Sequence, residues 1–146
     1  MTLAAVPFRS SDIPRMDAAR HIRELVFCRE QGISAADEWD DHDPVCEHFL
    51  LTSGQTPVGT ARVRPYGAHT FKIERMAVLK GDRNAGAGTF LMRAILMHMD
   101  AGQPPPVLLL NAQTAAERFY RKLGFEREGT VFEEAGIPHV RMVRRL

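Results

Sequence analysis

Two glycines beside an arginine carry the clearest chemical signal in the sequence. Gly86 and Gly88 follow Arg83 at the point where an apolar run, residues 71–79, gives way to a run with helical periodicity. Glycines at such a junction let an anion approach the backbone, and the first N–H groups of a helix point toward it. Arg83 adds a cationic fork for the same ligand. The pattern predicts a binding site for a diphosphate group.

Two widespread phosphate-binding motifs do not match this loop. A Rossmann fingerprint needs three glycines and a downstream acidic residue near a second parallel strand, and the sequence offers neither. A Walker A loop needs Gly-Lys followed by Ser or Thr, which is also absent here. A Gly-x-Gly pair alone also occurs in ordinary tight turns. Here the pair lies between a predicted strand and a predicted helix, and this position favours an anion-binding loop over an ordinary turn.

Residues 73–79 followed by Arg83-x-x-Gly86-x-Gly88 resemble the acetyl-CoA signature of the GCN5-related N-acetyltransferase (GNAT) family. Five further segments are similar to the ElaA and YjcF-like branch of that family, so that the resemblance covers nearly the whole chain: residues 23–27, 30–32, 111–113, 119–125 and 136–139. The resemblance implies an acyltransferase with acetyl-CoA as its cosubstrate. It also implies direct transfer to a primary amine, carried by a small molecule or a peptide, without a metal.

The resemblance further implies which residues hold the cosubstrate. In the family the central strand and the next strand splay apart and the pantetheine arm enters between them, which implies contacts from Met76, Ala77 and Val78. Around the pyrophosphate it places one continuous loop, made of Arg83, Asn84, Ala85, Gly86, Ala87, Gly88 and Thr89.

The reaction itself needs proton transfers. An amine must be neutral when it attacks a thioester, and the departing thiolate benefits from a proton. Tyr120 stands where many family members place a tyrosine that protonates the CoA sulfur, although a core aromatic is the alternative. Glu74, on the central strand, is the best candidate for the base, the alternative being an ion pair with Arg62 or Arg64.

Other polar residues have two interpretations each. Asn111 ends the buried strand, where its amide either holds the pantetheine or a bridging water, or caps the next helix. His48 and His139 are auxiliary bases or satisfy hairpin hydrogen bonds. The acidic segment 37–44 is expected to be a solvated loop rather than a metal site, because adjacent residues diverge and rarely chelate one ion.

The hydrophobic periodicity predicts the elements that carry these residues. Strands are expected at residues 6–8, 48–52, 57–64, 71–79, 107–110, 125–132 and 139–143, the last two joined by a turn at 136–138. Helices are expected at about 12–31, 87–99 and 116–123. The order predicts an α/β (α+β) GNAT fold. Its sheet is mixed and mostly antiparallel, has six to seven strands, is splayed between the central strand and the next, and carries flanking helices.

The composition excludes several other classes. A chain of 146 residues suits a single domain, here residues 1–146, and 19 basic against 18 acidic residues lack the excess that nucleic-acid binding requires. No apolar run approaches the roughly 20 residues of a membrane span. Two cysteines and an N-terminus without a signal-peptide pattern favour a cytoplasmic location. The oligomeric state is left open, and a homodimer is compatible with the sequence.

Two rival functions share parts of this pattern. A non-catalytic acyl-CoA-binding sensor or partner module would keep the loop and lack turnover. An autoinducer synthase has a related fold and a related N-terminal pattern of arginine and phenylalanine. It would be expected to be longer and to use S-adenosylmethionine with an acylated carrier protein, so the intact CoA loop argues against it.

Overall fold

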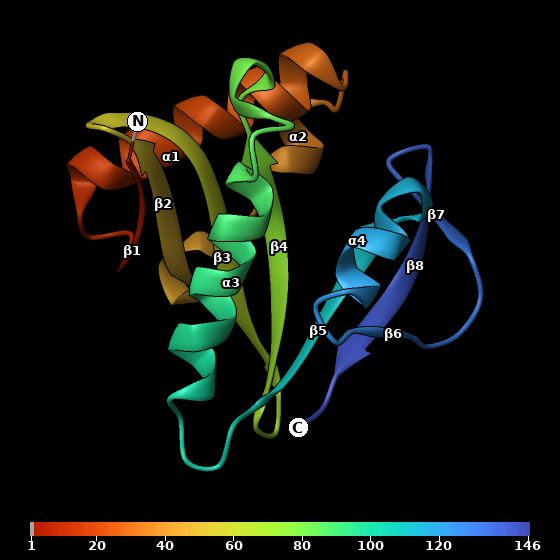
Figure 1. Ribbon diagram of the computed structural model, residues 1–146. Coiled ribbons are helices and arrows are strands. Elements are labelled where there is room, and N and C mark those ends of the chain that lie inside the picture. The colour runs from red at the N-terminus through yellow and green to blue at the C-terminus, as the bar shows by residue number, and fades with distance from the viewer. Residues whose placement is uncertain (1) are drawn as a thin grey trace.

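A mixed eight-stranded sheet forms the centre of the molecule (Figure 1). The computed structural model describes residues 2–146, apart from the side chain of Asp37. Along the sheet the strands lie in the order β1-β2-β3-β4-β5-β8-β6, and β7 pairs with β8. Their bounds are β1 Leu3–Phe8, β2 Glu47–Ser53, β3 Thr56–Gly67, β4 Thr70–Val78, β5 Val107–Gln113, β6 Glu126–Arg127, β7 Phe132–Glu134 and β8 Ile137–Arg144.

Two helices cover opposite faces of the first half of the sheet. On β2, Phe49 and Leu51 pack in the same core as Leu91 and Ile95 of α3 (Ala87–Asp100), whereas Leu50 packs with α1 (Ile13–Arg23). Successive residues of a strand point to opposite faces, so this alternation buries both faces of β2. The central strands are therefore held rigidly between the two helices.

The remaining helical segments connect these elements. A π-helix, η1 (Glu24–Glu30), continues α1, and the short α2 (Ala35–Glu38) and η2 (Asp43–Val45) follow it before β2. A 3-10 turn, η3 (Lys80–Asp82), precedes the loop to α3, and η4 (Thr114–Ala116) leads from β5 into α4 (Glu117–Arg121). Among residues 2–146, no helix combines the length and the apolar character that crossing a bilayer would need.

The two parallel strands at the centre of the sheet separate after a short stretch of pairing. β4 and β5 are in register only where Thr70–Lys72 face Val107–Leu109. β4 then continues to Val78 and β5 to Gln113 as their paths diverge (Figure 1). The predicted splay is confirmed, and below we call the space between the diverging parts the β4–β5 gap.

A bulge interrupts β4 beside this gap. Thr60 faces Ala77 and Arg62 faces Glu74, so Ala61 alone lies opposite the two residues Arg75 and Met76. Arg75 has a φ of 53°, in the left-handed region that residues other than glycine seldom adopt. Such a bulge bends the strand and redirects side chains, here at the edge of the gap.

The predicted fold class is confirmed, with differences in detail. Eight strands replace the expected six to seven, because the segment predicted as one strand at 125–132 forms the two short strands β6 and β7. The strand expected at 107–110 extends to Gln113. The hairpin turn between β7 and β8 consists of Ala135 and Gly136, both with positive φ, rather than residues 136–138.

Candidate active site

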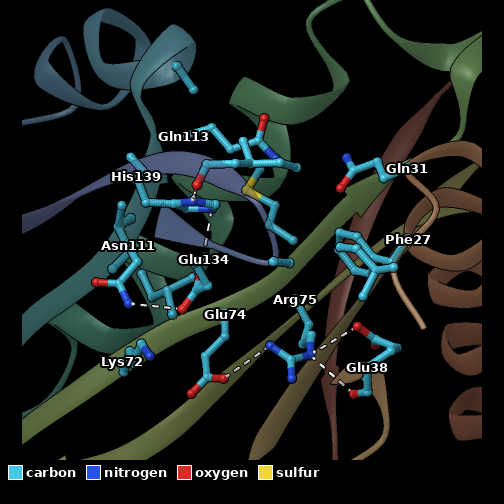
Figure 2. A pocket seen from close by; sticks show the side chains of 18 of the residues that line it. Phe27, Gln31, Glu38, Lys72, Glu74, Arg75, Asn111, Gln113, Glu134 and His139 are labelled. Atoms are coloured by element: carbon cyan, nitrogen blue, oxygen red, sulfur yellow. Dashed lines mark hydrogen bonds and ion pairs between the residues drawn. The ribbon is translucent and has the colours of Figure 1, made fainter. Parts of the chain in front are cut away.

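A cavity of about 470 Å³ occupies the β4–β5 gap. Residues of η1 and the segment after it close one side, and β4, β5, α4 and the β7–β8 hairpin form the rest (Figure 2). The lining residues that matter below are Phe27, Gln31, Glu38, Glu74, Arg75, Met76, Asn111, Gln113, Tyr120, Glu134 and His139. The predicted residues Glu74, Met76, Asn111 and Tyr120 thus share one cavity.

The glycine loop forms the N-terminus of α3. Gly86 is the residue before the first helical position and has a φ of 81°, which a residue with a side chain adopts only with strain. A Cβ added to Gly88 would have only the methyl group of Met76, 3.9 Å away, as a near neighbour. The N–H groups of Ala87, Gly88 and Thr89 have no partner within the helix, as at any helix start. This end of α3 has the geometry that an anion needs.

Arg83 lies beside this loop but is paired with a carboxylate. Its Nε donates to the carbonyl of Val78 at 2.9 Å, and its two terminal nitrogens donate to the two carboxylate oxygens of Glu30. The hydrogen bonds with Glu30 raise the pKa of Arg83 and lower that of Glu30. Both side chains are about one-third exposed, so the guanidinium lies at the surface next to the loop.

Tyr120 reaches from α4 across the gap to β4. Its hydroxyl is 3.7 Å from the sulfur of Met76, and its ring makes edge contacts with Phe119 and Phe125. Burial raises the pKa of Tyr120 to about 12. The phenol therefore keeps its proton at neutral pH, which is the state that a proton donor to a leaving group requires.

Asn111 lies within β5, not at a helix start. Its register partner on β8 is Arg141, and the strand continues for two more residues. The capping role that the sequence left open is therefore wrong. Its side-chain Oδ1 is buried without a hydrogen-bond partner, while Nδ2 lies 3.5 Å from Oε1 of Glu134. A buried acceptor that lines a cavity is available for a ligand N–H.

Glu74 forms the ion pair that the sequence offered as the alternative to a base. Oε2 accepts from Arg62 at 2.8 Å, and Oε1 accepts from Nε of Arg64. Burial alone would raise the pKa of Glu74, but the two guanidinium groups outweigh it and lower the pKa. A carboxylate held in this way is a weak proton acceptor, so its surroundings disfavour the base role.

The acidic segment is only partly solvated: Asp41 is exposed, whereas Glu38 and Asp43 are buried. Asp43 is buried and accepts from Arg23 at 3.0 Å and Arg62 at 2.9 Å, and Arg62 also donates two hydrogen bonds to Asp40. Glu38 is buried against Arg23. Together with the Arg62–Glu74 pair they form an arginine–carboxylate network, which joins the α1–β2 connection to β3 and β4. The solvated-loop prediction failed for three carboxylates, Glu38, Asp40 and Asp43, because they pair with arginines that are distant in sequence.

The histidines separate into two environments. His48 is buried, its Nε2 lies 2.9 Å from the carbonyl of Asp43, and burial lowers its pKa. It is outside the cavity lining. His139 lines the cavity on β8. Within the described residues, no cluster of three or more His, Cys, Asp or Glu side chains has metal-binding geometry.

Residues 30–146 match the family model of the acetyltransferase (GNAT) domain. The chain belongs to the GNAT family. The uncharacterized N-acetyltransferase YjcF of Bacillus subtilis (strain 168) is 39% identical over 130 residues, which are 86% of this chain and 89% of YjcF. The crystal structure of Escherichia coli ElaA superposes with a TM-score of 0.87 at 27% identity, covering 97% of this chain and 99% of ElaA.

The fold is shared more widely within the GNAT family. An acyl-CoA N-acyltransferase from Pseudomonas aeruginosa superposes with a TM-score of 0.89 at 23% identity, covering 99% of this chain and 100% of the other. Family membership identifies the chain as an acyl-CoA-dependent N-acetyltransferase whose acceptor is not specified. Sequence reasoning missed Glu134 and Arg75 as lining residues. The available signal for Glu134 was its closeness to residues 136–139, a segment that already resembled the family.

Proposed function

We propose that this GNAT enzyme transfers an acetyl group from acetyl-CoA to a primary amine of a small molecule or peptide, by direct attack in a ternary complex. The observation that carries the proposal is the cavity in the β4–β5 gap, which has the N-terminus of α3 beside it and Tyr120 across it. The N-terminus of α3 would bind the diphosphate, the edge of β4 would bind the extended pantetheine arm, and Tyr120 would lie near the thioester.

The backbone supports the placement of the cosubstrate. β4 pairs with β5 only as far as Lys72, so the edge at Met76, Ala77 and Val78 would hydrogen-bond an extended pantetheine arm. On this edge the carbonyl of Val78 already accepts from Nε of Arg83. The buried Oδ1 of Asn111 would accept from one of the arm's amide N–H groups. The pyrophosphate would lie on the loop from Arg83 to Thr89, on the positive end of the α3 dipole.

The thioester would then lie near Tyr120. As the amine nitrogen bonds to the carbonyl carbon, the C–S bond breaks and the sulfur needs a proton. The phenol of Tyr120 retains that proton at neutral pH because burial raises its pKa to about 12. Holding both reactants in one cavity supplies much of the rate, since a two-molecule encounter becomes an internal step.

A CoA-release assay tests this proposal. The chain is incubated with acetyl-CoA and a panel of ethanolamine, putrescine, benzylamine and a lysine peptide, and the free thiol is measured continuously. We expect amine-dependent release and an acetylated amine of matching mass. Binding is checked separately by thermal shift with CoA, where a ligand at 100 times its Kd stabilises by about 2.7 kcal/mol. Binding of CoA without turnover on any amine would overturn the proposal in favour of a sensor module.

A further inference from the structure

Glu134 and His139 face one another in the cavity and lack a proton donor between them. Nδ1 of His139 lies 2.7 Å from the carbonyl oxygen of Ile137. A carbonyl oxygen only accepts, so Nδ1 carries the hydrogen and donates, and in the neutral ring Nε2 has the lone pair. Oε2 of Glu134 lies 3.6 Å from that Nε2 (Figure 2). Two acceptors therefore face each other.

The strands fix this arrangement. His139 is opposite Gln113 on β5 and opposite Phe132 on β7, so it is held from both sides of β8. Residues directly opposite each other in an antiparallel pair share a face, which puts Glu134 and Ile137 on the same side as Phe132 and His139. The rings of Phe132 and His139 stack at 6.1 Å. The imidazole therefore has little freedom to turn away.

The two side chains differ in exposure in a way that suits an incoming cation. The side chain of His139 is 9% exposed, whereas that of Glu134 is 51% exposed. Nδ2 of Asn111 lies 3.5 Å from the other carboxylate oxygen of Glu134, Oε1. The carboxylate is thus reachable from solvent, while the imidazole lies deeper in the cavity.

We propose that Glu134 and His139 form the site that binds and deprotonates the acceptor amine, with Glu134 attracting the ammonium and His139 acting as the catalytic base. This inference rests on the proposed function. It assigns deprotonation of the amine to His139, because Glu74 is held by Arg62 and Arg64 and is a weak proton acceptor. An ammonium group is the donor that two facing acceptors lack.

The protons and electrons balance as follows. The ammonium hydrogen-bonds both Glu134 and Nε2 of His139, and one proton passes to Nε2, which leaves a neutral amine and an imidazolium paired with Glu134. The amine lone pair forms the C–N bond and the C–S pair leaves on sulfur. Tyr120 gives its proton to the thiolate and recovers the second proton lost by the nitrogen, and His139 returns its proton to solvent.

The proposal predicts separable effects of two substitutions. His139→Ala should lower kcat/KM for the amine by about 100-fold or more, the usual contribution of a positioned general base, and leave the KM for acetyl-CoA unchanged. Added imidazole should restore part of the lost rate, since the substitution leaves room for it. Glu134→Gln should mainly raise the KM for the amine, because it removes the charge that attracts the ammonium.

A matched control is available on the surface. His98 and Glu47 form another His–Glu pair, with Nε2 2.9 Å from Oε1, and both are outside the cavity lining. His98→Ala should therefore keep the activity of the unaltered chain and show no response to imidazole. The amine that gives the fastest CoA release is used throughout, and CoA binding by thermal shift reports whether each variant is folded.

Three outcomes would overturn the inference. One is a His139→Ala variant whose kcat/KM stays within about threefold of the unaltered chain. The second is a loss that CoA binding shares, which would mean a purely structural role. The third is a loss that imidazole does not restore combined with no change in amine KM for Glu134→Gln. If the unaltered chain binds CoA but forms no free CoA from acetyl-CoA with any amine, the proposed function is wrong, and this inference is wrong with it.

Discussion

Arg83 and Glu30 form a two-pronged ion pair that links the end of η1 to the loop before α3. The pair joins residues 53 positions apart in the sequence. Its arginine is the cation closest in sequence to the glycines, so a diphosphate bound as proposed would compete with Glu30 for one guanidinium. Arginine binds carboxylate and phosphate oxygens with the same planar fork, which makes the exchange chemically direct.

Removing that competition should strengthen CoA binding. We expect Glu30→Gln to lower the Kd for CoA by about two- to fivefold, the scale of an exposed ion pair, because the arginine is released and a negative charge beside the pyrophosphate disappears. Titration calorimetry measures the change. Glu24→Gln is the matched control, since Glu24 pairs with Arg29 in the same π-helix, away from the loop. Weaker binding by Glu30→Gln would instead mean that Glu30 positions Arg83 for its ligand.

Gly88 offers a test in which stability and binding move in opposite directions. Gly88 lies in the first turn of α3, where a Cβ would make one ordinary contact, with the methyl group of Met76 at 3.9 Å, so Gly88→Ala should leave the free energy of unfolding unchanged or raise it by up to about 1 kcal/mol. The new methyl group would obstruct the approach of the diphosphate. We expect a Kd for CoA at least about tenfold higher, a cost of roughly 1.4 kcal/mol.

Denaturant unfolding and calorimetry separate these two effects. Gly81→Ala is the control, because Gly81 also has open space around its Cβ position and lies in η3, before the loop. Unchanged CoA binding by Gly88→Ala would place the diphosphate elsewhere.

Tyr120→Phe should affect turnover more than binding. Loss of the phenol proton should lower kcat by about 10- to 100-fold at an unchanged KM for acetyl-CoA. The pKa raised to about 12 also has a stability consequence. Below pH 10 the partly buried phenol contributes stability, and this contribution is lost as the pH rises from about 10 toward 12, because the unfolded chain ionises first.

The phenylalanine variant should lack that alkaline decrease in the Tm measured between pH 9 and 12. Full activity in Tyr120→Phe would assign the leaving-group proton to another donor. A Tm profile identical to that of the unaltered chain would show that burial does not raise the pKa of Tyr120.

Glu74→Gln should damage stability more than chemistry. Its carboxylate is 8% exposed, so its loss removes one of the three carboxylate partners of the buried Arg62 and the carboxylate partner of Arg64. Breaking a buried ion pair costs about 3 kcal/mol or more, and we expect that decrease in the free energy of unfolding by urea. At temperatures where the variant is folded, kcat should stay within about tenfold of the unaltered chain. A much larger loss of kcat in a stably folded variant would restore Glu74 as the base.

Acid should act through the same network. The pKa values of Glu74, Asp40 and Asp43 are lowered by arginine partners that outweigh the effect of burial on the carboxylate, whereas burial raises the pKa of Glu38 and offsets part of their effect. Their stabilisation is therefore complete above about pH 4.5 and decreases as the pH falls through the lowered values. Urea unfolding at pH 7, 4 and 3 should show a decreasing free energy of unfolding. A flat profile would contradict the network's contribution.

Patterns that are local in sequence predicted most of the fold and several of the residues that line the cavity. The position of the glycines at the start of α3 and the apolar stripe of that helix follow from patterns within a few residues, and both were predicted correctly. The partners of Glu74 were foreseen because β3 and β4 adjoin as a hairpin. The network around Asp43 was not, because Arg23 and Arg62 reach it from distant elements. Glu134 was not predicted as a site residue, because only the two-residue turn between β7 and β8 brings its carboxylate close to the imidazole of His139.

One extra residue in β4 decides what each side of that strand contributes. A regular strand would keep strict odd–even alternation, and from Met76 onward every side chain would exchange faces relative to Glu74. With Arg75 and Met76 set against Ala61 alone, the alternation changes parity once, so that Ala77 packs under α1 while Met76 meets Tyr120. If the bulge were lost with every residue kept, Met76 instead of Ala77 would lie opposite Thr60, so Met76 would turn toward α1 and Ala77 toward Tyr120.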